Sequence, residues 1–104
     1  MQKLQNYVTG KWLYGEGEQQ ILYNAVTGEP IFSTSTQGLD FYSILQYGRE
    51  KGTAALRRLT FHERAAMLKA LALHLQKHLD VFYQLSYMTG ATKTDSWIDI
   101  EGGI

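Results

Sequence analysis

Residues 60–90 constrain the fold of this chain most, because their pattern is that of a helix. Thr60 and Glu63 have the spacing of a capping box, in which the hydroxyl accepts from the Glu63 N–H and the carboxylate accepts from the Thr60 N–H. Apolar residues then recur at helical steps of three and four, at Phe61, Ala65, Leu68, Leu71, Leu75, Leu79, Phe82 and Leu85. We expect one helix or two in succession, the second capped by Asp80, with Gly90 ending the run as its C′ residue.

The helix that follows Thr60 is apolar around most of its circumference. One broad face carries Met67, Leu68, Leu71, Ala72, Leu75 and Leu79. Leu73, together with Ala66 and Ala70, falls on another side, and only a narrow strip around Lys69 and Gln76 is clearly polar. A helix of this kind is usually enclosed by other elements, so we expect it to belong inside something larger.

The first 36 residues have the composition of a small antiparallel β unit. Residues 7–14 are aromatic and β-branched with a Thr-Gly pair between them, which is typical of a hairpin. A second strand is predicted from Ile21 and a return strand after Pro30, with a turn at residues 24–29 centred on Thr27 and Gly28.

Residues 37–104 are expected to be helical. Residues 39–56 fit a helix softened by Gly48 and Gly52, each of which costs about 1 kcal/mol relative to Ala. Thr94 or Asp95 could cap a further helix that begins near Trp97. The sequence therefore predicts one α+β domain with three or four helices, and its ending after a Gly pair suggests truncation at the C-terminus.

Composition excludes several classes of function. The 104 residues contain ten basic and ten acidic side chains, so nothing favours a nucleic-acid or membrane-surface partner. The chain has no cysteine, which excludes a disulfide framework, a cysteine zinc cluster and a thiol nucleophile within it. No apolar run approaches the roughly 20 residues of a membrane span, and the N-terminus lacks the apolar core of a secretory signal. We expect a cytoplasmic protein.

Three residue patterns could suggest a site. His74 and His78 have the i, i+4 spacing of helical metal sites, but no neighbouring acid or cysteine in the sequence completes a ligand set. Residues 15–17 resemble the start of a dinucleotide fingerprint without its third glycine. Asp99 and Glu101 are two residues apart, a spacing that points their side chains to different sides of a helix. We therefore expect no catalytic, cofactor-binding or metal-binding residue in this chain.

Several motifs resemble the N-terminal stretch of the aldehyde dehydrogenase superfamily. These are Gly10-Lys11-Trp12, then Thr27-Gly28-Glu29, then Arg58-Leu59-Thr60 with Glu63-Arg64, and finally Thr89-Gly90. Two positions depart from the family pattern: Ala25 replaces a proline, and Ala91 follows Gly90 where the family has Lys-Pro. The run from Ala91 to Ile104 is similar to one branch, the bifunctional ring-opening enzymes of bacterial phenylacetate degradation, as is the run from Phe61 to Leu71.

The resemblance implies a function for a longer parent protein with the α/β aldehyde dehydrogenase fold. That parent would oxidise a CoA-linked semialdehyde to an acid with NADP, or NAD, and would carry a fused enoyl-CoA hydratase domain. Its catalytic Cys and Glu and its cofactor strands lie outside residues 1–104. The implied partners are the remainder of the dehydrogenase domain and further copies in a homo-oligomer. Trp97, Ile98 and Ile100 are candidates for the substrate entrance, and packing of Trp97 in the core is an equal alternative.

A second hypothesis also explains the large apolar surface of the helix that follows Thr60. The chain could be a stand-alone α+β protein-interaction module without catalytic activity, whose helix recruits a partner. An open reading frame that continues into a Cys-containing domain would favour the dehydrogenase, and a stop codon after Ile104 would favour the module.

Overall fold

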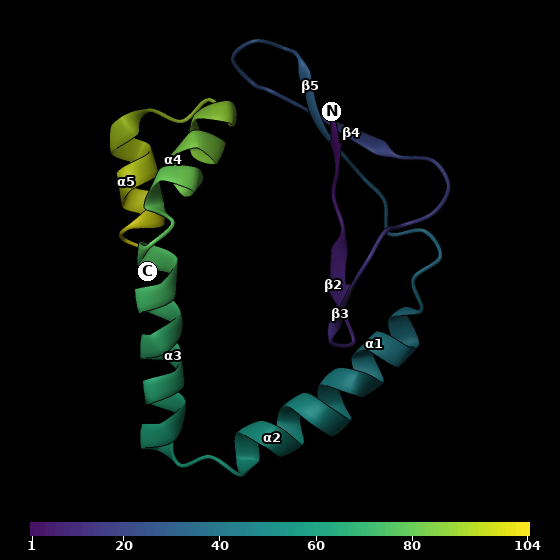
Figure 1. Cartoon of the computed structure of the whole chain (residues 1–104), viewed down its shortest axis with the longest axis vertical. Coiled ribbons are helices and arrows are strands. Elements are labelled where there is room, and N and C mark those ends of the chain that lie inside the picture. Colours follow the sequence, from purple (N-terminus) through teal and green to yellow (C-terminus); the bar gives the residue numbers. More distant parts are fainter. The chain divides into compact units, whose positions relative to one another are not determined.

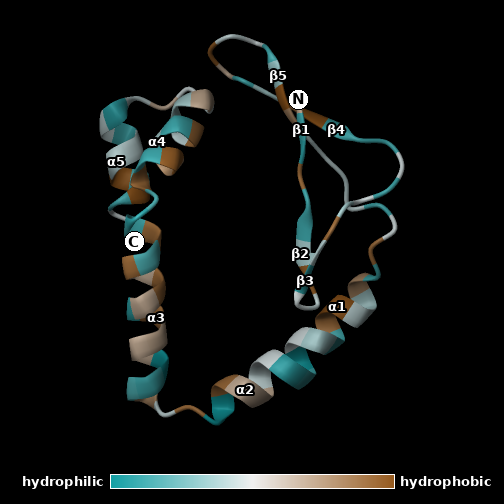
Figure 2. Ribbon diagram, in the orientation of Figure 1, coloured by the Kyte–Doolittle hydropathy of each residue, from teal (hydrophilic) through white to brown (hydrophobic).

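The computed structural model describes residues 1–104 and has an α+β architecture, as the sequence predicts. The chain divides into two compact units. The first contains Met1–Tyr23 and Glu29–Arg58, and the second contains Asn24–Gly28 and Leu59–Ile104. Figure 1 labels the helices of both units and the strands of the first except the N-terminal one, which Figure 2 labels.

The first unit holds two small sheets. One is the antiparallel hairpin of β2 (Asn6–Val8) and β3 (Lys11–Leu13). The other has the order β1-β5-β4, with β1 (Gln2–Lys3), β4 (Gln20–Tyr23) and β5 (Pro30–Thr34). Both predicted hairpins are confirmed, but β1 pairs parallel to β5, so the expectation of a purely antiparallel unit was wrong. A strand of two residues has no detectable period, and its partner lies about thirty residues away.

The β2–β3 hairpin closes through the predicted Thr-Gly pair. Thr9 has a φ of 51° and Gly10 a φ of 81°. Two central residues with positive φ give the type I′ geometry, whose twist matches that of the flanking strands. Gly10 adopts this conformation without a Cβ clash, whereas Thr9 is β-branched and takes it at a cost. The Thr9 hydroxyl donates to the Val8 carbonyl at 2.8 Å.

A helical run follows the sheets and carries an irregular middle. It comprises α1 (Phe41–Tyr47), a π-helical segment (Gly48–Gly52) and α2 (Thr53–Arg57). The two glycines that were expected to soften this helix bound the π segment, where the helix takes wider i→i+5 hydrogen bonds. Asp40 caps the run by accepting from the Ser43 N–H and hydroxyl, and these bonds lower the pKa of Asp40. The helix thus begins at Phe41 rather than at Leu39.

The predicted capping box begins the main helix, α3 (Phe61–Gln76). The Glu63 N–H donates to the Thr60 hydroxyl at 3.2 Å, and the Thr60 N–H donates to the Glu63 carboxylate at 2.7 Å. The second expected helix is α4 (Leu79–Met88), and Gly90 follows it with a φ of 87°, so the predicted stop is confirmed. Its N-cap, however, is His78 and not Asp80. Asp80 lies in the first turn of α4, where its carboxylate interacts favourably with the positive end of the helix dipole.

The last helix, α5 (Lys93–Ile100), begins earlier than expected. Its N-cap is Thr92, whose hydroxyl accepts from the Asp95 N–H at 3.2 Å. The predicted caps Thr94 and Asp95 lie inside the helix, and the predicted start near Trp97 was wrong. Thr92 is the first residue after the Gly90 turn with a side chain able to cap a helix, which explains the earlier start.

Apolar side chains are left uncovered over most of the chain. No apolar residue is buried, and the exposed fraction is 75% for Phe61, 61% for Leu68 and 53% for Leu73. Figure 2 shows hydrophobic residues along α3. Leu68 and Leu73 belong to different sides of this helix and both are exposed, which agrees with the expectation that the helix is apolar around most of its circumference. The only buried side chains with polar groups belong to Ser33 and Ser96. None of the helices is both long and apolar enough to span a bilayer.

Candidate functional site

Polar side chains gather where α4 and α5 meet, in the second unit. Figure 1 shows these two helices joined by a short loop, with α5 turning back along α4. Ser96 of α5 is completely buried, and its hydroxyl donates to the Thr92 carbonyl at 2.8 Å. The Ser86 hydroxyl lies 2.7 Å from that of Ser96. Because Ser96 has already used its only proton on Thr92, Ser86 is the donor of this bond.

A second bond joins the other ends of the two helices. The Tyr83 hydroxyl donates to a carboxylate oxygen of Glu101 at 2.5 Å. This hydrogen bond, with smaller contributions from desolvation and the nearby negative charge, raises the pKa of Tyr83 to about 12. A tyrosine with a raised pKa holds its proton at neutral pH. Tyr83 is therefore suited to donate a hydrogen bond and unsuited to act as a general base.

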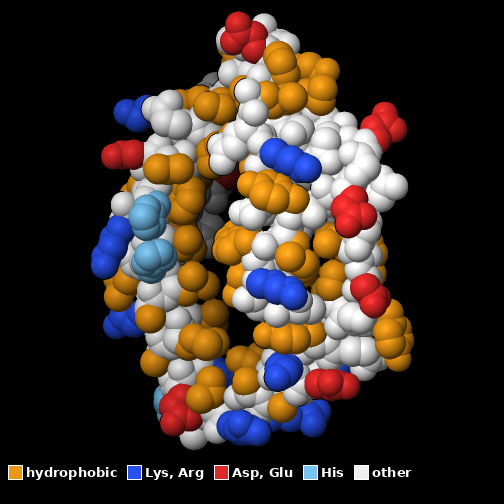
Figure 3. Space-filling view, turned by 45° about the vertical axis from the view of Figure 1, so that its right-hand side comes forward, with side chains coloured by type: hydrophobic (Ala, Val, Ile, Leu, Met, Phe, Trp, Pro, Cys, Tyr) orange, Lys and Arg blue, Asp and Glu red, His pale blue; other side chains and the backbone are white.

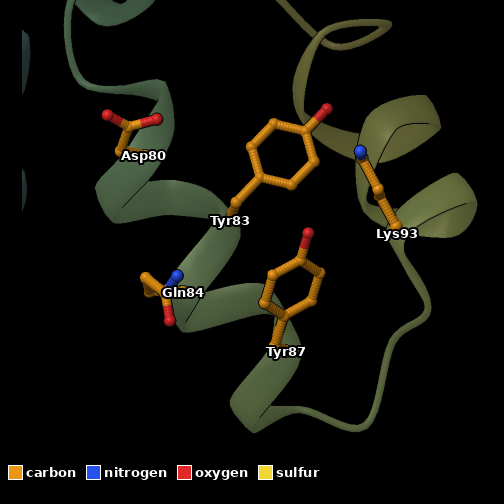
Figure 4. A pocket seen from close by; sticks show the side chains of 5 residues that line it. All are labelled: Asp80, Tyr83, Gln84, Tyr87 and Lys93. Atoms are coloured by element: carbon orange, nitrogen blue, oxygen red, sulfur yellow. The ribbon is translucent and has the colours of Figure 1, made fainter.

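An open hollow of about 420 Å³ lies beside this bond. Figure 4 shows its lining, with Tyr83 and Tyr87 side by side from α4 and Lys93 facing them from α5. The two tyrosine rings have centroids 6.0 Å apart, and the remaining lining residues are Asp80 and Gln84. The set offers hydrogen-bonding groups and one charge of each sign, but it contains no nucleophile with a base and no oxyanion hole.

Two further hollows lie on α3 and are mainly apolar. Phe61, Ala65 and Leu68 line one of about 450 Å³ together with Arg64. The other, of about 240 Å³, is lined by Leu68, Leu71, Ala72, Leu75, Gly103 and Ile104. The C-terminal half of the α3 face is thus partly covered by the residues after α5, and its N-terminal half is open. Such a surface suits packing against another protein surface better than binding a polar ligand.

The three candidate residues for a substrate entrance all lie on α5. Trp97 is 57% exposed and Ile98 is 56% exposed, whereas Ile100 is half-buried. Trp97 and Ile100 are three residues apart and share a side of the helix, and Ile98 is offset from both. The structure brings the three onto one helix without enclosing a cavity around them, so their role at an entrance stays a prediction.

Two of the residue patterns noted in the sequence lie in the second unit. The Glu101 carboxylate accepts a hydrogen bond from the Tyr83 hydroxyl, and the expectation that Asp99 and Glu101 point apart stays a prediction. The rings of His74 and His78 lie with centroids 5.0 Å apart, and no group of three or more His, Asp or Glu side chains surrounds a common point. Sequence reasoning missed Tyr83, Ser86 and Ser96. Their partners are ten to eighteen residues away, and serines or tyrosines in helices carry no local signal of such pairing.

Comparison with known proteins connects this chain to one enzyme. No protein-family model matches the sequence. The chain is 42% identical over 103 residues to 3,4-dehydroadipyl-CoA semialdehyde dehydrogenase from Aromatoleum evansii. The match covers 98% of this chain and 20% of the relative, so the chain spans about a fifth of that enzyme's length. Along nearly all of its residues, this chain is therefore related in sequence to part of an aldehyde-oxidising dehydrogenase, an oxidoreductase.

Proposed function

We propose that this chain is the N-terminal structural part of an aldehyde dehydrogenase that oxidises a CoA-linked semialdehyde to the acid, with NADP as the electron acceptor. The observation that carries the proposal is the 42% identity to a CoA-semialdehyde dehydrogenase over 98% of the chain. The Gly10-Lys11-Trp12 strand and the capping box at Thr60 add to it, because both motifs resemble the superfamily.

In this proposal the chain supports the chemistry without performing it. Oxidation of an aldehyde by this route needs a nucleophile that adds to the carbonyl carbon, so that hydride can then leave to the nicotinamide. The chain has no cysteine to supply that thiolate. Its conspicuous polar group, Tyr83, is held in the protonated form by Glu101. The nucleophile and the cofactor cradle belong to the other four fifths of the enzyme.

The contribution of the chain is a packing surface on α3. Phe61, Leu68 and Leu71 are each more than half exposed and follow one another along a single helix face. Burial of a side chain of this size contributes about 1.5–3 kcal/mol relative to its exposure. Contact between this face and the rest of the dehydrogenase domain would therefore stabilise the enzyme substantially, and the uncovered face supports this role.

The finer assignment rests on residues 91–104. This run is similar to that of the ring-opening enzymes of phenylacetate degradation, and it forms α5 with the residues on either side of it. We accordingly assign the parent enzyme to phenylacetate degradation, with a fused enoyl-CoA hydratase domain, a homo-oligomeric assembly and a cytoplasmic location. NAD in place of NADP is the alternative acceptor.

A chimera tests the proposal. The matching fifth of the Aromatoleum evansii enzyme is replaced by this chain, and reduction of NADP⁺ or NAD⁺ is followed at 340 nm with a CoA-linked semialdehyde. We expect dehydrogenase activity in the chimera. The control carries a helical sequence of the same length and unrelated composition at the same place and should be inactive. A soluble chimera with the parent's assembly state and no activity would overturn the proposal.

The interaction module remains the second candidate, because the exposed face of α3 would also suit a partner protein. The two candidate functions predict different behaviour of the isolated chain. A segment separated from its own domain should self-associate through α3 and should show no dehydrogenase activity. A monomeric chain with a sharp cooperative melt would favour the module.

A further inference from the structure

Two histidines lie side by side at the joint between α3 and α4. His74 is in the last turn of α3, and His78 is the N-cap of α4, two residues after α3 ends. Their ring centroids are 5.0 Å apart, the ring planes are inclined at 60°, and both side chains are exposed. Figure 3 shows two histidine side chains in contact on the surface, in pale blue. Neither is used by the proposed dehydrogenase role.

The separation of the two rings fits a shared metal ion. A metal bound to a ring nitrogen lies about 3.2 Å from the centre of that ring, because the metal–nitrogen bond is about 2.0 Å long. Two imidazoles on one ion therefore have ring centres about 4.5 Å apart at a right angle and about 5.2 Å apart at the tetrahedral angle. The observed 5.0 Å falls between these limits. Both side chains are exposed, so each can rotate to direct a ring nitrogen at a shared ion.

We propose that His74 and His78 form a two-point binding site for a divalent transition-metal ion of the zinc class. Imidazole nitrogen prefers zinc, nickel and copper, whereas magnesium and calcium take oxygen ligands. No group of three or more His, Asp or Glu side chains forms here, so water completes the coordination and the ion exchanges readily. The bound ion ties the end of α3 to the start of α4 across Lys77 and holds the angle of the joint.

The chain supplies a matched control in His62. This residue lies in the first turn of α3, far along the helix from the joint, and its ring has Phe61 as its aromatic neighbour at 6.0 Å. It is exposed like the other two histidines. It can bind zinc at one point only. A chelate gains affinity from its second ligand, because that ligand binds within the same molecule at a high effective concentration.

Equilibrium dialysis of the 104-residue chain against Zn²⁺ tests the site, and it works in any assembly state. We expect one zinc bound per chain, an apparent affinity about tenfold weaker in both His74→Ala and His78→Ala, and no change in His62→Ala. Mass-spectrometric mapping of diethylpyrocarbonate modification should show that zinc protects His74 and His78 but leaves His62 reactive. Mg²⁺ should protect none of them.

The same measurements can overturn the site. Absence of zinc binding at millimolar concentration would exclude it. Equal affinity in His74→Ala and the unmodified chain, or equal zinc protection of His62, would show single-point surface binding instead of a chelate. Far-UV circular dichroism of each variant confirms that α3 and α4 are intact, which is expected because the three imidazoles are exposed.

Discussion

The hydroxyl oxygens of Ser86 and Ser96 lie 2.7 Å apart where α4 and α5 pack together, and Ser96 is completely buried there. The Ser96 proton goes to the Thr92 carbonyl, so a chain of bonds runs from Ser86 through Ser96 to the first turn of α5. This seam, with the Tyr83–Glu101 bond, holds α5 in place although the second unit has no buried apolar residue.

Replacement of Ser96 should destabilise the packing of α5. Ser96→Ala removes both bonds and should lower the free energy of unfolding by about 1 kcal/mol. Ser96→Leu should cost more, about 1–3 kcal/mol, because the site has no room for a larger side chain. Urea unfolding followed by far-UV circular dichroism measures both. Thr94→Ala, an exposed change on the same helix, is the control, and an unaltered midpoint in Ser96→Leu would contradict the buried seam.

Tyr83 should ionise late in an alkaline titration. Its pKa is raised to about 12 from the ordinary 10.0, chiefly by the bond to Glu101. Because the folded form holds the proton more tightly, this bond stabilises the fold fully below pH 10, and the contribution is lost as the pH rises from 10 to 12. Phenolate absorbance at 295 nm, compared between the unmodified chain and Tyr83→Phe, isolates the Tyr83 transition. Glu101→Gln should move that transition to lower pH; an unmoved transition would refute the assigned cause.

The face of α3 should govern both self-association and enzyme assembly. Leu68→Glu places a charge in the middle of the open apolar surface, where burial would be costly. We expect the isolated chain to associate less and the chimeric dehydrogenase to lose activity and solubility. Sedimentation velocity and the 340 nm assay measure these effects. Gln76→Glu adds the same charge on the polar strip of α3 and should change neither; similar losses in both variants would argue against a specific face.

Replacement of Trp97 should change the KM for the substrate rather than the stability of the fold. It is 57% exposed on α5, so Trp97→Ala removes little packing within this chain. If Trp97 lines the substrate entrance, the chimera carrying Trp97→Ala should show a raised KM for the semialdehyde with a nearly unchanged melting temperature. A lowered melting temperature with an unchanged KM would assign Trp97 to the core of the assembled enzyme. An unchanged KM with unchanged stability would remove Trp97 from consideration.

Features set by neighbours in the sequence were predictable. The capping box of Thr60 and Glu63, the Gly90 stop and the Thr9–Gly10 turn each depend on residues at most three positions apart. The helical face of α3 and its surplus of apolar residues follow from the period of the sequence alone. Where two local signals competed the outcome was less certain, as with His78 in place of Asp80 at the start of α4 and Thr92 in place of Thr94 at the start of α5.

The sequence by itself therefore determined the α+β class, the main helices with the Thr60 cap and the Gly90 stop, the two hairpins and the similarity to a dehydrogenase. Only the tertiary structure decided the parallel pairing of β1 with β5, the burial of Ser96, and the bond between Tyr83 and Glu101. Periodicity and capping are local properties, since they depend on side chains within one or two turns. The contacts between separate elements depend on how the chain folds back on itself. A single sequence carries no direct signal of which distant residues meet.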